Sequence, residues 1–205
     1  MKRIKIEDPG KTPSFIGSWN IEPLEICDDL IKFFERNPQL HEEGKTFQGV
    51  NKKFKKSTDL PISPHHLEEV EYSSAKRYVN SLFECYEDYL KQWPFLKRAE
   101  TLDIGSFNIQ RYHKGEHFNR LHTERFSLAN SFRLLAWMTY LNDVEAGGTT
   151  YFQNYDLKIY PKKILLKKLQ ITLINFFLIE INEIYYFRMW KFNGCTKTRR
   201  FFWKL

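Results

Sequence analysis

Two residues of metal-binding type, His122 and Glu124, lie two positions apart in a segment, Phe118 to Phe126, with the composition of a β-strand. Side chains at positions i and i+2 of a strand point to the same face, and their Cα atoms are about 7 Å apart. An imidazole and a carboxylate at that spacing can bind one divalent cation, whereas on a helix the same pair would diverge. The spacing therefore predicts a metal site on one face of a strand.

The third ligand of such a site is missing from the later sequence. Two histidines and one carboxylate, with coordination positions left open, are the ligand set of non-haem Fe(II) oxygenases. None of the six histidines follows His122, and we expect His113 and His117 to be loop residues. Glu180, Glu183 and Cys195 have suitable side chains, but no spacing favours any of them. The sequence thus predicts two ligands and leaves the third open.

Two helices are expected in the first half of the chain. Leu24, Leu30 and Phe34 belong to an apolar stripe between Pro23 and Arg36, before Asn37-Pro38 ends the helix. A second stripe with the 3.6-residue period runs from about Ser73 to Trp93, and Pro94 ends it. The polar segment between them, Thr46 to Pro64, predicts a loop or a short edge strand whose lysines form a solvated face: Lys52, Lys53, Lys55 and Lys56.

Extended segments dominate from Ile104 onward. Phe107 to Tyr112 and the segment around His122 have strand patterns, and Arg133 to Leu141 is apolar on both faces, as in a strand inside a sandwich. Asn142-Asp143 and Gly147-Gly148 bound a turn, after which Thr149 to Phe152 resumes the sheet. Helices followed by strands predict an α+β fold whose sheets form a sandwich or jelly roll.

The segment after Lys163 differs in composition from the rest. Ile, Leu, Phe, Tyr, Asn and Lys dominate it, Pro and His are absent, and Gly194 is its one glycine. Ten Lys and Arg against two Glu lie from Lys162 onward, so this part accounts for the whole net charge of +7. Because the remainder is close to neutral, we do not expect nucleic acid as a partner. The apolar stretch Thr172 to Phe187 contains Glu180 and Glu183 and is too short for a membrane span, although a surface-lying amphipathic segment stays open.

Length and cysteine usage indicate one cytoplasmic domain. A chain of 205 residues with 17% aromatic side chains can bury one substantial core. The first residues are charged and lack the apolar stretch of a secretory signal. Three scattered cysteines, Cys27, Cys85 and Cys195, form no CxxC pair and suit a reducing compartment. The oligomeric state cannot be inferred.

An ordered series of motifs resembles the catalytic core of 2-oxoglutarate- and Fe(II)-dependent dioxygenases of the prolyl 4-hydroxylase-like branch. The series consists of Phe107-Asn-Ile-Gln-Arg-Tyr112, Gly115, Phe118, His122-x-Glu124, Arg133 to Asp143, and Gly147-Gly148-Thr-Thr-Tyr-Phe152. The resemblance implies a double-stranded β-helix, the jelly-roll or cupin-like fold, over residues 101–163. Supporting helices would occupy 16–100, so that 1–163 forms one dioxygenase-like domain.

The resemblance also implies roles for individual residues. His122 and Glu124 match the metal ligands, with Glu where many relatives have Asp. Tyr112 and Thr150 match residues that hold 2-oxoglutarate; the structural alternatives are a packed tyrosine with its hydroxyl on the rim and a threonine in a cross-strand pair. Arg133 matches a core-strand arginine, for which we expect a structural ion pair. The implied reaction couples decarboxylation of 2-oxoglutarate to C–H hydroxylation by O2 of a small-molecule or peptidyl substrate, with ascorbate as a candidate reductant.

The resemblance ends after Tyr160-Pro-Lys-Lys163. The family continues with a glycine, a strand, a distal histidine and a basic residue, none of which is in place here. Our hypothesis is that residues 164–205 are an atypical tail translated out of frame, which would leave the jelly roll without its last strands and the chain inactive. The alternative from another class is a non-catalytic cupin-like binding module whose basic tail contacts anionic lipid or nucleic acid.

Overall fold

The computed structural model describes residues 2–6, 15–98, 103–123, 128, 131, 133–144, 146–161, 171–174, 176–179, 184–189 and 192–193. Within these ranges an eight-stranded sheet is the largest element, and its neighbouring strands are antiparallel. The strand order is β1 (Lys2–Ile4), β2 (Gly17–Asn20), β15 (Ile171–Ile174), β12 (Ala136–Tyr140), β17 (Ile184–Met189), β9 (Phe107–Tyr112), β7 (Thr58–Ile62) and β3 (Glu42–Glu43).

A second antiparallel sheet lies opposite the first. Its order in the described part of the chain is β11 (His122–Thr123), β16 (Phe176–Ile179), β13 (Thr150–Phe152) and β14 (Leu157–Ile159). From β9 onward the chain passes back and forth between the sheets, since β9, β12, β15 and β17 belong to the large sheet and β11, β13, β14 and β16 to the small one. This alternation brings strands that are distant in sequence into contact.

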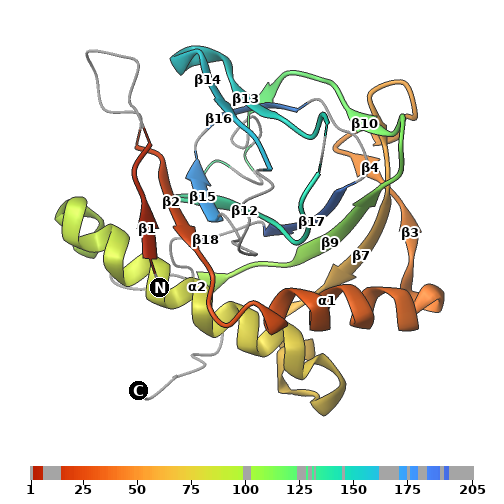
Figure 1. Cartoon of the computed structure of the whole chain (residues 1–205), viewed down its shortest axis with the longest axis horizontal. Helices are drawn as coiled ribbons and strands as arrows, with labels where there is room; N and C mark the ends of the chain where they lie inside the picture. Colours follow the sequence, from red (N-terminus) through yellow and green to blue (C-terminus); the bar gives the residue numbers. More distant parts are fainter. Residues whose placement is uncertain are drawn as a thin grey trace.

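Two helices cover the outer face of the large sheet. Figure 1 shows α1 (Glu25–Arg36) and α2 (Ser73–Gln92) beneath it, with β13, β14 and β16 on the other side. Both helices place apolar residues at helical spacing in the core, as Leu30 and Phe34 of α1 and Tyr78 and Leu82 of α2 illustrate. The helices begin and end within two residues of the expected positions.

The two faces of the large sheet belong to different clusters. Phe107, Ile109 and Trp137 pack against the helices. Tyr112 and Met138, which point to the opposite face, form a second cluster between the sheets together with Phe152. A strand that is apolar on both faces was expected at residues 133–141, and β12 confirms it.

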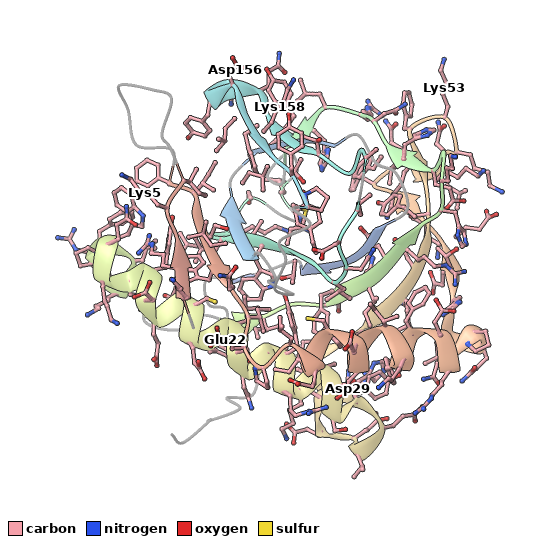
Figure 2. All side chains as sticks on the ribbon, in the orientation of Figure 1. Lys5, Glu22, Asp29, Lys53, Asp156 and Lys158 are labelled. Atoms are coloured by element: carbon pink, nitrogen blue, oxygen red, sulfur yellow. The ribbon has the colours of Figure 1, made fainter. Side chains whose placement is uncertain are left out.

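Short elements complete the described part. Three strand pairs are two residues long on each side: β4 (Lys45–Thr46) with β5 (Gly49–Val50), β6 (Lys55–Lys56) with β10 (His117–Phe118), and β8 (Asp103–Ile104) with β18 (Phe192–Asn193). The 3-10 helices are η1 (Pro38–Leu40), η2 (Pro64–Glu68), η3 (Val70–Tyr72), η4 (Pro94–Arg98) and η6 (Gln153–Tyr155). Figure 2 shows exposed charged side chains such as Lys5, Lys53 and Asp156 near the outline of the molecule.

The tail does not leave the sheets without their last strands, so that expectation is wrong. β15 pairs with β2 and β12, β17 pairs with β12 and β9, and β16 pairs with β11 and β13. The physical reason is that Ile, Phe and Tyr favour strands, and the edges of β9 and β12 offer unpaired backbone groups to them. Pairing of strands requires less sequence specificity than formation of a metal site.

The first half of the chain is also more than a helical support. β2, β3 and β7 lie between residues 16 and 100 and belong to the large sheet. The segment expected to be a loop or edge strand contains β7, which lies between β9 and β3. Lys52, Lys53 and Lys56 are exposed as expected, but Lys55 is buried. No helix of the described residues is long and apolar enough to cross a membrane.

Candidate functional site

His122 lies on β11, and its ring is held from two sides. The ring stacks on Phe118 with centroids 4.4 Å apart, and Nδ1 is 2.9 Å from the backbone oxygen of Arg120. Because a carbonyl oxygen only accepts hydrogen bonds, Nδ1 is the donor in this contact, and in a neutral imidazole the lone pair is then on Nε2. A backbone contact of this kind is the usual way in which a metal-binding histidine has its tautomer fixed.

The strand expected from Phe118 to Phe126 is divided within the residues that the structure describes. β10 ends at Phe118 and β11 begins at His122, and the two belong to different sheets. Glu124, the second expected ligand, lies outside the described residues. His113 follows β9 and is exposed, as expected of a loop residue. His117 was also expected in a loop, but it lies on β10, where it pairs with Lys56, and its Nε2 is 3.2 Å from the backbone oxygen of Lys53.

The strand that pairs with β11 contains no residue of metal-binding type. The neighbouring strand β16 reads Phe-Phe-Leu-Ile, and Phe177 is the Cα partner of His122. The structure brings no three His, Cys, Asp or Glu side chains together anywhere in the ranges that it describes. The imidazole of His122 is a donor that suits Fe(II), and a facial triad needs two further ligands from the protein.

Tyr112 is at the end of β9 and only 2% exposed, in the cluster between the two sheets. Its hydroxyl donates to Oε1 of Gln110 at 3.4 Å. It is thus a buried tyrosine with a polar partner inside the sandwich, not a tyrosine on the rim.

Thr150 is fully buried at the start of β13 and has a partner that the motif analysis missed. Its Oγ1 lies 2.5 Å from the hydroxyl of Tyr140, and it also reaches Sδ of Met138 at 3.5 Å. The Tyr140 hydroxyl lies 3.3 Å from the backbone oxygen of Ile159, to which it donates when Thr150 supplies the proton between the two hydroxyls. Tyr140 and Thr150 belong to opposite sheets, so this hydroxyl pair bridges the interior. Arg133, expected in an ion pair, precedes β12 and is buried.

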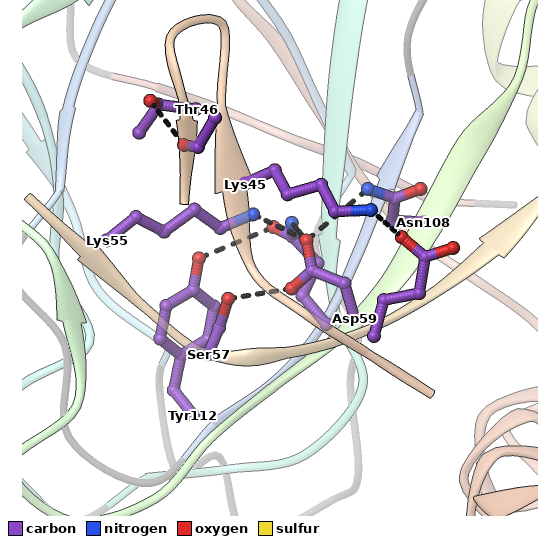
Figure 3. Close-up of polar contacts among 10 residues, drawn as sticks. Lys45, Thr46, Lys55, Ser57, Asp59, Asn108 and Tyr112 are labelled. Carbon is purple, nitrogen blue, oxygen red and sulfur yellow. Dashed lines mark hydrogen bonds and ion pairs between the residues drawn. The ribbon is translucent and has the colours of Figure 1, made fainter. Parts of the chain in front are cut away.

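A charged network lies in the same interior and was also missed (Figure 3). Asp59 accepts from Lys55 Nζ at 2.5 Å, from Ser57 Oγ at 2.7 Å and from Gln110 Nε2 at 2.7 Å. Asn108 Nδ2 is 3.4 Å from the same carboxylate. The signal that could have revealed the network is the period of two in Lys55, Ser57 and Asp59, which places all three on one face of an extended segment.

The register of the large sheet joins the network to the hydroxyl pair. Asp59 is the Cα partner of Gln110, Gln110 that of Tyr186, and Tyr186 that of Tyr140. Directly opposed positions in antiparallel strands lie on the same face. The described side chains of Asp59, Gln110 and Tyr140 therefore lie on one face of the sheet, with Tyr112 two residues beyond Gln110 on the same strand and face.

The comparisons with known proteins agree with this architecture at the level of fold. No protein-family model matches the chain, and no curated protein sequence matches it significantly. A prolyl-4-hydroxylase from Pseudomonas putida superposes with a TM-score of 0.62 over 89% of this chain and 94% of its own, at 15% identity. A prolyl hydroxylase from Trichoplax adhaerens, solved with a peptide fragment of the hypoxia inducible factor oxygen degradation domain, gives 0.63 over 88% and 84%, at 12% identity. The chain therefore has the fold of these two prolyl hydroxylases.

Proposed function

We propose that this chain is a 2-oxoglutarate- and Fe(II)-dependent oxygenase of the prolyl 4-hydroxylase-like type by fold and descent, with an incomplete metal site. The alternation of strands between two antiparallel sheets supports a double-stranded β-helix. The similarity to two prolyl hydroxylases supports the same assignment. The observation that carries the proposal is the buried polar interior, where Tyr112, Tyr140 and Thr150 present hydroxyl groups between the sheets.

The proposed division of labour follows the positions of these groups. His122 Nε2 and the carboxylate of Glu124 are the proposed metal ligands, and Fe(II), when bound, would supply activation of O2. Tyr112 and Thr150 are the proposed contacts of 2-oxoglutarate, and Tyr140 joins them because its hydroxyl lies 2.5 Å from Thr150 Oγ1. Hydroxyl groups in a site from which water is excluded orient a dicarboxylate and favour one binding pose.

The incomplete ligand set leads us to expect negligible turnover of this chain. With Fe(II), 2-oxoglutarate and O2, succinate formation should not exceed that of the His122→Ala variant. Succinate formed briskly by the unmodified chain would contradict this expectation and would mean that another side chain completes the site, with Glu180, Glu183 and Cys195 as the first to replace.

Binding of 2-oxoglutarate tests the proposed co-substrate contacts of Tyr112 and Thr150. In calorimetric titrations with Mn(II) present, Tyr112→Phe and Thr150→Val should each weaken binding by about tenfold, as expected when a hydrogen bond to a charged group is lost. Tyr151→Phe is the matched control, because its hydroxyl bonds to Asp156 at 2.9 Å on the surface. Equal affinities in all these variants would exclude the proposed co-substrate site.

A further inference from the structure

The Asp59 carboxylate determines the orientation of the Gln110 amide. Its described partners are all donors: the ammonium of Lys55, the hydroxyl of Ser57 and the amides of Asn108 and Gln110. A carboxylate paired with a buried ammonium accepts hydrogen bonds and donates none. The amide end of Gln110 that faces it at 2.7 Å is therefore the NH2 group. The charge of Asp59 thus selects one of the two orientations of the Gln110 amide, whose nitrogen and oxygen could otherwise be interchanged.

The opposite end of the amide then fixes the role of Tyr112. With its nitrogen committed to Asp59, Gln110 turns Oε1 toward the Tyr112 hydroxyl, 3.4 Å away. A carbonyl oxygen cannot donate, so the tyrosine must. At this length the hydrogen bond is weak, and little is lost when the proton turns away from it.

We propose that Gln110 is a positioning residue that holds the Tyr112 proton in the ligand-free protein and releases it when a ligand binds. The oxygens of a carboxylate or a keto acid also only accept, so they compete with Gln110 Oε1 for the one proton of Tyr112. Asp59 acts through Gln110, because its charge prevents the amide from presenting a donor to the tyrosine. The hydrogen bond from Tyr112 to Gln110 concerns the ligand-free chain alone, whereas the release of the proton to a ligand rests on the proposed function.

Vibrational spectroscopy of the ligand-free protein tests the hydrogen bond from Tyr112 to Gln110. The ring-mode doublet of tyrosine in ultraviolet resonance Raman spectra distinguishes a phenol that donates a hydrogen bond from one that does not. The difference between the unmodified chain and Tyr112→Phe isolates the spectrum of Tyr112. We expect this difference spectrum to show that Tyr112 donates a hydrogen bond. The difference between Gln110→Met and the double variant Gln110→Met/Tyr112→Phe should lack that donor signature.

The matched control is Asn108→Leu, which removes another donor to Asp59 without a described contact to Tyr112. Its Tyr112 spectrum should keep the donor signature. Circular dichroism and the unfolding midpoint confirm that each variant is folded, since Asp59 retains three of its donors in Gln110→Met. A donor signature that persists in Gln110→Met, or that is absent from the unmodified chain, would overturn the proposal.

Ligand affinity tests the release of the proton. Because Gln110→Met removes a competing acceptor, the affinity for 2-oxoglutarate with Mn(II) should rise by about two- to fivefold, the effect of one weak hydrogen bond. In the Tyr112→Phe background the same substitution should have no effect. Weaker binding in Gln110→Met would refute the release while a donor signature would still support the resting arrangement. Absence of 2-oxoglutarate binding in every variant would sink both the proposed function and the release.

Discussion

At the scale of single residues, the Lys55–Asp59 pair is the most consequential departure from the expected surface. The side chains are only 3% and 6% exposed, although Lys55 belongs to a lysine-rich segment whose other lysines reach solvent. Two unlike charges can be buried together if each has partners, and Ser57 and Gln110 supply further donors to the carboxylate. Removal of one partner would leave a buried charge without compensation.

Asp59→Asn should therefore destabilise the protein by about 3–5 kcal/mol, the usual cost of breaking a buried ion pair from one side. The double variant Lys55→Met/Asp59→Asn should recover most of that loss, because no charge remains buried. Urea unfolding followed by circular dichroism measures both. Asp29→Asn provides the comparison, since Asp29 pairs with Arg77 on the surface and should contribute less than about 1 kcal/mol. Equal unfolding midpoints for Asp29→Asn and Asp59→Asn would contradict the assignment.

Burial also raises the pKa of the Cys85 thiol, to about 12, with the nearby Glu84 carboxylate as a smaller cause. The pKa of Tyr78 is raised for the same first reason, burial. Below the ordinary thiol pKa of about 8.5 both groups are protonated whether the chain is folded or not. Above it the unfolded chain releases protons that the folded chain retains, so stability falls as pH rises from about 9 toward 12. Urea midpoints at several alkaline pH values measure this loss, which should be smaller in Cys85→Ala.

At the scale of elements, strand β16 decides whether the metal site can be completed. Position 177 is the Cα partner of His122, so a ligand placed there would share its face, whereas position 178 lies on the other face and opposes Tyr151. Phe177→His should therefore tighten Co(II) binding and intensify its visible absorption, and Leu178→His should not. If the two variants bind Co(II) equally well, the strand register beside His122 is not the one described.

The same elements show which structural features the sequence patterns could predict. Periodicity located α1 and α2 closely because a helix has a local repeat, and it placed Tyr112 and Thr150 on strands of the sandwich. It missed Lys55 and Tyr140 because their environments depend on residues far along the chain, such as Gln110 for the Asp59 network. The division between β10 and β11 was missed as well, since short strands that change sheets leave no period to detect.

At the scale of the whole molecule, the unusual composition of residues 164–205 remains consistent with our reading-frame hypothesis, because a random sequence rich in Ile, Phe and Tyr also forms strands. The coding DNA across codon 163 should then encode, in another frame, a glycine, a strand, a histidine and a basic residue in that order. Sequencing of this region decides the question. Three frames without that series would mean that the tail is the native sequence.

The position of β15 constrains when the sheet can assemble. β1 and β2 join the large sheet through β15 alone in the described register, and β15 follows them by most of the chain. During synthesis β1 and β2 therefore emerge long before β15. Until β15 is made, Trp19 and its neighbours are not yet covered on that edge of the sheet. Contacts between such distant segments slow folding and prolong the exposure of strand edges. We expect chaperone dependence during translation to be concentrated at this early hairpin.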